Sequence, residues 1–166
     1  MVDQTPHIAP ELQEILAAVS DPEIPVLSIL EMGVVREAIL EESKAFVKIT
    51  PTYSGCPAMD VIGDDIKAAL KNAGFDAEVK LVLSPAWTTD WITEKGRIAL
   101  REYGIAPPLE ADADKEALLG NKKIVSCPQC NSTNTKMVSQ FGSTACKAFF
   151  QCEDCLEPFD YFKCLK

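Results

Sequence analysis

Four cysteines near the C-terminus have the residue type and the spacing of a metal site. Cys127 and Cys130 form one C-x-x-C pair, and Cys152 and Cys155 form another, with 21 residues between the pairs. Two intervening residues let both sulfurs of a pair reach one tetrahedral ion, at the Zn–S distance of about 2.3 Å, without straining the backbone. The spacing therefore predicts a structural zinc site with four thiolate ligands. Two disulfides are the alternative interpretation.

The metal and the remaining thiols of this region leave further alternatives open. The same four thiolates can hold a single redox-active iron, so an electron carrier is a second interpretation. Cys146 and Cys164 have no assigned role. For Cys146 the alternatives are an extra ligand, a sulfur acceptor or a buried apolar residue, since free cysteines are commonly buried. If both joined the other four sulfurs, the site would suit an iron–sulfur cluster instead of zinc.

One more thiol, Cys56, lies far from this group, at the predicted start of a helix. It precedes Pro57, and proline is favoured as the first helical residue because its missing N–H needs no partner there. The positive end of a helix dipole favours a thiolate at this position. Cys56 is thus a candidate metal ligand or nucleophile. The alternative is a small buried cap.

The composition excludes several classes of function. The chain has 16 basic and 25 acidic residues, and no segment has the basic surface that binding to nucleic acid requires. No apolar run is long enough to span a membrane, and residues 1–20 lack the features of a secretory signal. Seven cysteines then indicate a reducing compartment, the cytoplasm. A single histidine, His7, and the lack of an acid–base pair or phosphate loop argue against an enzyme.

Hydrophobic periodicity predicts two domains. In residues 1–104 it indicates helices and strands in the order α-β-β-α-β-α, at residues 10–20, 34–40, 44–50, 57–73, 78–83 and 92–103. This order predicts an α+β domain, a small mixed sheet with helices on one face. Residues 105–123 contain two adjacent prolines and are predicted to be a linker. Residues 124–166 are too short for a core of their own, which predicts a small all-β zinc ribbon in which metal substitutes for buried area.

Several segments resemble known families. Residues 21–25 (DPEIP), 33–35 (GVV) and 50–57 (TPTYSGCP) resemble the SufT-like iron–sulfur assembly domain. Residues 83–91 (LSPAWTTDW), 141–148 (FGSTACKA) and 157–159 (EPF) are similar to the PaaD family of the aerobic phenylacetate pathway. The resemblance covers nearly the whole chain, with both domains in order.

The resemblance implies a non-catalytic accessory protein of the phenylacetyl-CoA epoxidase system. Its expected task is maturing metal centres, either the iron–sulfur cluster of the reductase component or the di-iron oxygenase. The cysteine matching Cys56 is expected to hold or pass the cluster or iron, and the acidic residues matching Asp21 and Glu23 are expected near it. A role for these two carboxylates in capping a turn is the alternative.

The resemblance also implies cofactors and partners. The expected cofactors are structural zinc in a ribbon that docks the client, and a transient iron–sulfur cluster or iron. The expected partners are the epoxidase subunits, foremost the iron–sulfur reductase, and a second copy of the chain. A scaffold that only holds epoxidase subunits together is a further alternative.

Overall fold

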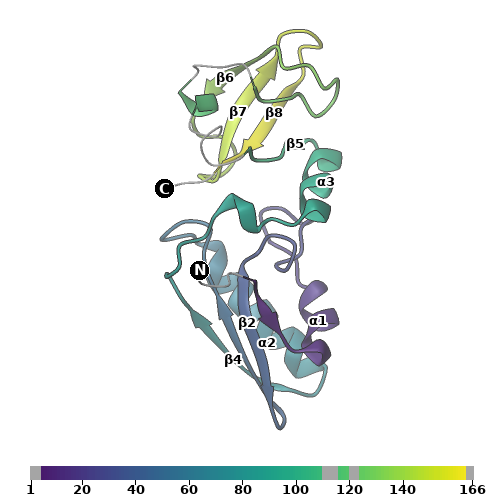
Figure 1. Cartoon of the computed structure of the whole chain (residues 1–166), viewed down its shortest axis with the longest axis vertical. Coiled ribbons are helices and arrows are strands. Elements are labelled where there is room, and N and C mark those ends of the chain that lie inside the picture. Colours follow the sequence, from purple (N-terminus) through teal and green to yellow (C-terminus); the bar gives the residue numbers. More distant parts are fainter. Residues whose placement is uncertain (1–4, 110–115, 120–123, 164–166) are drawn as a thin grey trace. The chain divides into compact units, whose positions relative to one another are not determined.

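The computed structural model describes residues 5–109, 116–119 and 124–163. The chain divides into two compact units, Met1–Trp87 and Thr88–Lys166. Figure 1 shows the helices and strands of both. None of the helices in the described ranges has both the length and the apolar content that a membrane span requires.

The first unit is built on a mixed sheet of four strands in the order β1-β2-β3-β4. Strands β2 (Val35–Glu41) and β3 (Lys44–Ile49) lie close to two of the predicted ranges and form an antiparallel hairpin, and β4 (Asp76–Leu81) pairs with β3 in parallel. The short strand β1 (His7–Ile8), which was not predicted, pairs in parallel with β2. The predicted small mixed sheet is confirmed.

Helices cover one face of this sheet. Along β3, Ala45, Val47 and Ile49 are buried while Lys44 and Lys48 are exposed, as the alternating pattern predicts. Helix α1 (Pro10–Ala17) contacts β2, and helix α2 (Ala58–Asn72) contacts β4 and α1. Burial of a large aliphatic side chain stabilises the fold by about 1.5–3 kcal/mol, and the fully buried ones in this unit include Leu12, Leu16, Leu27, Ile29, Ile66 and Leu70.

The second unit begins with the 3-10 helix η1 (Thr89–Trp91), and helix α3 (Glu94–Tyr103) follows it. The Thr93 hydroxyl caps α3 by accepting a hydrogen bond of 3.1 Å from the Gly96 N–H. Gly104 ends the helix with a φ of 94°, a conformation that glycine adopts without strain. The sequence pattern predicts a domain limit after this residue, whereas the compact units divide before α3.

The ribbon sheet explains this difference. Its strand order is β5-β8-β7-β6, with β6 at Thr135–Ser139, β7 at Lys147–Cys152 and β8 at Pro158–Phe162. Strand β5 (Ile105–Ala106), in the predicted linker, pairs in parallel with β8, and α3 contacts β5. Residues 105–106 therefore belong to the ribbon sheet, and α3 is joined to it. The limits of the independently folding domains stay a prediction.

The ribbon core also draws on the predicted linker. Residues 116–118 are helical, while residues 110–115 lie outside the described part. Residues upstream of position 124 thus supply part of the apolar core. The ribbon therefore does not depend on metal alone to make up for its small buried area. The members of this core are Ala106, Ala117, Val125, Cys127, Ala148, Phe150, Cys152, Phe159 and Tyr161.

Candidate functional site

The two C-x-x-C pairs lie on two similar turns of the ribbon. Each turn is followed by a residue with positive φ, Asn131 at 61° and Leu156 at 66°. In the first turn the Cys127 carbonyl accepts a hydrogen bond of 2.9 Å from the Asn131 N–H. An aliphatic residue in the left-handed region costs about 1–2 kcal/mol. Leu156 is exposed, so burial of its own side chain does not offset this cost.

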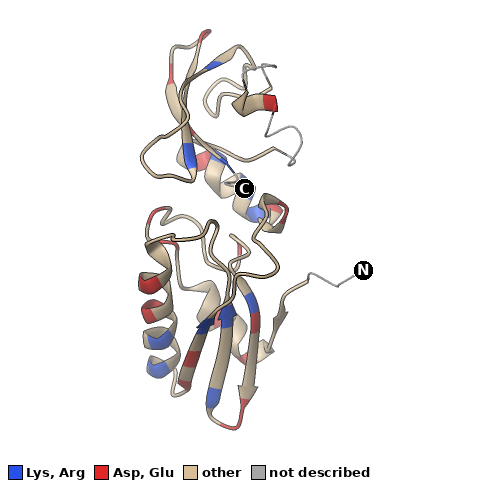
Figure 2. Cartoon of the chain, turned by 90° about the vertical axis from the view of Figure 1, so that its left-hand side faces the viewer, with Lys and Arg blue, Asp and Glu red and all other residues tan. Residues whose placement is uncertain are grey.

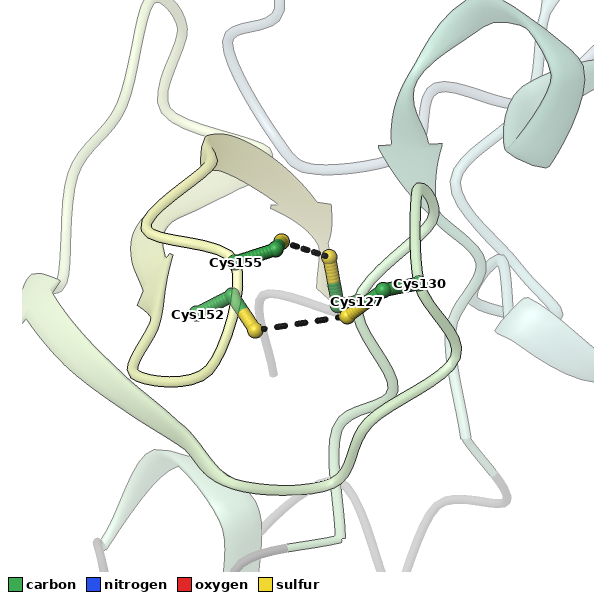
Figure 3. Close-up of side chains that lie close together, drawn as sticks. All are labelled: Cys127, Cys130, Cys152 and Cys155. Atoms are coloured by element: carbon green, nitrogen blue, oxygen red, sulfur yellow. Dashed lines mark hydrogen bonds between the residues drawn. The ribbon is translucent and has the colours of Figure 1, made fainter.

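The four sulfurs converge on one point (Figure 3). The Sγ atoms of Cys127 and Cys155 are 3.7 Å apart, and those of Cys130 and Cys152 are 3.6 Å apart. All four ligand atoms lie within 4.8 Å of one another. A tetrahedron with Zn–S bonds of 2.3 Å has sulfurs about 3.8 Å apart, whereas a disulfide needs about 2.05 Å. The arrangement fits zinc, and these cysteines are not paired as disulfides.

A carboxylate joins the two turns beside the sulfurs. Asp154, between the cysteines of the second pair, accepts a hydrogen bond of 2.7 Å from the side-chain amide of Asn134 and a shorter one from the Ser132 hydroxyl. The Glu153 N–H donates to the Asn134 carbonyl at 2.8 Å. We call Ser132, Asn134 and Asp154 the clasp. The clasp was not predicted, because Asp154 lies 20 residues from Asn134 and 22 residues from Ser132 in the sequence.

Cys56 lies half-buried, one residue before Pro57, the N-cap of α2. Its sulfur accepts hydrogen bonds from the Ala58 N–H and the Tyr53 side chain, and the carboxylates of Glu23 and Asp21 are close enough to act on its charge. The structure thus brings the three predicted residues into one neighbourhood. Tyr53 was missed as a partner, although it stands in the same motif.

The electrostatics of Cys56 oppose the predicted activation. Burial raises the pKa of the Cys56 thiol above its ordinary value of 9.0, and the charges of Glu23 and Asp21 raise it further. The hydrogen bonds from Ala58 and Tyr53 lower this pKa but do not reverse the shift. The helix end therefore does not yield a thiolate at neutral pH.

Asp21, one of the two carboxylates near Cys56, is buried and hydrogen-bonded to the backbone. Asp21 is 6% exposed, and its Oδ1 accepts hydrogen bonds from the N–H groups of Glu23 at 2.8 Å and Ile24 at 3.0 Å. Asp21 thus caps a turn, which was the alternative interpretation. Within the described ranges, only the four ribbon cysteines bring three or more potential ligand atoms together. Cys56, Asp21 and Glu23 therefore do not form a ready-made ion site.

Comparisons with known proteins match both units. The model of an iron–sulfur cluster assembly protein family matches residues 10–81, and that of the PaaD zinc beta ribbon domain matches residues 111–163. A protein of Escherichia coli (strain K12) named as a putative 1,2-phenylacetyl-CoA epoxidase component is 47% identical over 156 residues, which cover 93% of this chain and 92% of that protein. The chain belongs to the PaaD family.

Relatives outside the PaaD family share the first unit. The Fe-S protein maturation auxiliary factors YitW of Bacillus subtilis (strain 168) and SufT of Staphylococcus aureus (strain USA300) are each 35% identical. YitW aligns over 51% of this chain and 85% of its own length, SufT over 49% and 96%. A crystal structure of a domain of unknown function from Bacillus anthracis matches with a TM-score of 0.51 and 31% identity, covering 54% of this chain and 88% of that one. The predicted resemblance and the α+β fold class are confirmed.

Cys146, in the segment that resembles the PaaD family most, lies outside the four-sulfur group. It is 5% exposed, and its sulfur is 3.1 Å from the Thr144 hydroxyl. In this arrangement it is not a fifth ligand of the ribbon. The other unassigned thiol, Cys164, lies outside the described residues. The roles of both stay a prediction.

Breaking the clasp is expected to loosen the metal. Asp154→Asn removes the negative charge of the acceptor that joins the turns, so we expect zinc affinity to fall ~10–100-fold, as for other groups that position metal ligands. Competition with a chromogenic chelator measures this. Glu153→Gln is the matched control, because it removes the same charge from the adjacent position. Equal zinc affinity in Asp154→Asn and the unaltered chain would show that the clasp does not position the ligands.

The thiol of Cys56 is expected to react only at high pH. Because its pKa is raised above 9.0, its alkylation by iodoacetamide should rise with pH later than that of an ordinary cysteine. Glu23→Gln removes a charge that raises this pKa and should move the profile to lower pH. The folded chain holds this proton more tightly than the unfolded chain, so the stabilisation is complete below pH 9 and is lost as the pH rises further. A profile centred below pH 9 would contradict the assignment.

Proposed function

We propose that this chain is a non-catalytic accessory factor that assists metal-centre assembly in a phenylacetyl-CoA epoxidase system, with the iron–sulfur cluster of the reductase component as its main target. The observation that carries the proposal is the partly exposed Cys56 beside two carboxylates, in the unit that matches an iron–sulfur cluster assembly family. The relatives YitW and SufT are named as Fe-S protein maturation auxiliary factors, and the E. coli relative as an epoxidase component.

Cys56 holds its cargo transiently. Clusters typically take four protein ligands, and Cys56 is the one cysteine in the sequence of the first unit. The remaining ligands therefore come from the client or from a second copy of the chain. A temporary ligand suits a factor that must release the cluster or iron to its client.

The two carboxylates make ionisation of the Cys56 thiol depend on the binding of iron. Burial, together with the negative charges of Glu23 and Asp21, raises the pKa of the free Cys56 thiol, but the same charges attract a cation. An approaching iron favours the thiolate, so its binding releases the proton of Cys56. The thiol is then a ligand only when cargo is present.

The zinc-stabilised ribbon is a docking surface for the folded part of the client. Its four cysteines hold zinc, which ties the two turns together. The buried Cys127 and Cys152 join this site to the apolar core. Reduced thiols at both sites require a reducing compartment, so we place the protein in the cytoplasm.

The test is the cluster content of the reductase in cells that lack this chain. We expect the reductase to accumulate with little of its cluster, and expression of the chain to restore it. Iron, sulfide and absorption spectra of the anaerobically purified reductase measure this. A fully loaded reductase in the deletion cells would overturn the proposal. If the chain still co-purified with epoxidase subunits, that outcome would favour the scaffold.

A further inference from the structure

The first unit has a groove beside the helix that starts at Cys56. The groove lies between α2 and the strands β3 and β4 and has a volume of about 290 Å³. Its floor is apolar, formed by Ile49, Met59, Val79 and Leu81. Asp60, Asp64 and Lys67 of α2 also line it. Lys67 forms an exposed ion pair of 3.6 Å with Asp64, so among the described residues Asp60 is the unpaired charge of the lining, and the net charge of the lining is negative.

The groove borders an open edge of the sheet. Strand β4 is the last strand of the order β1-β2-β3-β4, and β3 is its only strand neighbour within the described ranges. Leu81 at its end is 49% exposed, and Leu83, just beyond it, is 61% exposed. Asp76, Glu78 and Lys80 place charges on β4, a common protection against unwanted strand pairing, but the strand ends in these exposed leucines. An open edge with an apolar end beside a groove can accept an added strand.

Gly63 keeps the groove open. It lies in the middle of α2, where glycine weakens a helix relative to alanine. Packing does not require it, because an added Cβ would lie 3.9 Å from Val79 Cγ1, an ordinary contact distance. The helix thus carries an unfavourable residue at a position that lines the groove.

Charge and position indicate what the groove takes. Acidic side chains gather in the first half of α2 and lysines in its second half (Figure 2). Residues 1–87 carry 14 acidic and 6 basic side chains, so this unit attracts basic segments. The Met59 N–H donates to the Cys56 carbonyl at 3.3 Å, so one end of the groove adjoins the backbone of Cys56.

We propose that the groove and the free edge of β4 bind an extended segment of the client protein, with apolar residues at alternate positions and a basic residue facing Asp60 and Asp64. The segment adds a strand to the sheet beside β4. Its apolar side chains enter the groove, and the bound chain passes close to Cys56. This inference rests on the proposed function and names how the client is recognised.

The test measures binding of the full chain to the purified apo form of the iron–sulfur reductase of the epoxidase, by calorimetry. Gly63→Leu fills the groove, and we expect it to weaken binding ~10-fold or more, as for a central interface position. Ala68→Leu is the matched control, because it adds the same side chain at an exposed position of α2. Hydrogen exchange should show the outward amides of β4 slowed by the reductase in the control and in the unaltered chain only.

Two further variants separate the possible outcomes. The double exchange Asp60→Asn and Asp64→Asn removes both charges from exposed side chains and should weaken binding, and thermal unfolding of this variant checks that the fold is kept. Cys56→Ser should bind the reductase as the unaltered chain does while failing to mature it. If Gly63→Leu bound the reductase normally, the groove would be excluded as the docking site and the role of Cys56 would stand. If Gly63→Leu lost only self-association, the occupant would be a second copy, and the proposal would be wrong.

Discussion

Cells that carry only the Cys56→Ser variant are expected to mature the client no better than cells that lack the chain. The substitution exchanges a sulfur for an oxygen at a half-buried position, and a serine hydroxyl can still accept from the Ala58 N–H at the start of α2. The fold should therefore persist. What is lost is the soft ligand, because an alcohol neither ionises near neutral pH nor binds soft metals as a thiolate does. Reductase activity and cluster content measure the effect.

The controls for this experiment lie in the same loop and in the other unit. Ser54→Ala alters an exposed neighbour in the motif and should mature the client fully. The Cys56→Ser protein should still contain one zinc per chain, because its ribbon cysteines are unchanged. Normal reductase activity in cells that carry only Cys56→Ser would remove this thiol from the mechanism.

Replacing Cys152 by serine is expected to release zinc and unfold the ribbon while the first unit stays folded. Structural zinc contributes about 10–16 kcal/mol of binding free energy, which matches or exceeds the whole stability of a typical domain, about 5–15 kcal/mol. The apolar core and the clasp of this small unit cannot offset such a loss. Cys152 is fully buried in that core, so the substitution also buries a hydroxyl without a metal partner.

Thermal unfolding followed by circular dichroism, with zinc content measured in parallel, tests this expectation. The Cys152→Ser protein should lose the transition of the ribbon and keep that of the first unit. Cys56→Ser is the control, because it removes one sulfur and leaves the metal site intact. A ribbon that keeps its dispersed amide resonances after zinc has left would show that the metal is dispensable for folding.

Local patterns were sufficient to predict the strands and the metal ligands. The alternation of Ala45, Val47 and Ile49 with lysines is a property of one strand, and it identifies the buried face directly. The C-x-x-C spacing is likewise a property of single turns, so the four ligands could be read without knowing the fold. The short strands β1 and β5 could not be predicted from the sequence, because a strand of two residues has no periodicity.

Properties that depend on contacts between distant parts of the sequence were either missed or predicted in the wrong direction. The clasp joins Asp154 to residues before β6, and no local pattern relates them. The pKa of Cys56 was predicted from its helix end alone, but burial and a carboxylate brought from the loop after α1 determine its direction. Leu156 is a residue that sequence rules would not place at positive φ. Each of these depends on neighbours that only the tertiary structure supplies.

The protonated state of Cys56 bears on how the protein survives in an aerobic cell. Peroxide attacks thiolates, and a thiol that keeps its proton is oxidised slowly. Because burial and the charges of Glu23 and Asp21 preserve that proton, the idle protein resists conversion to a sulfenic acid. The alkylation profile of Cys56 reports this same protection, since both reactions consume the thiolate. In the proposed role of Cys56 as a transient ligand, this proton keeps the thiol reduced while no metal or cluster is bound.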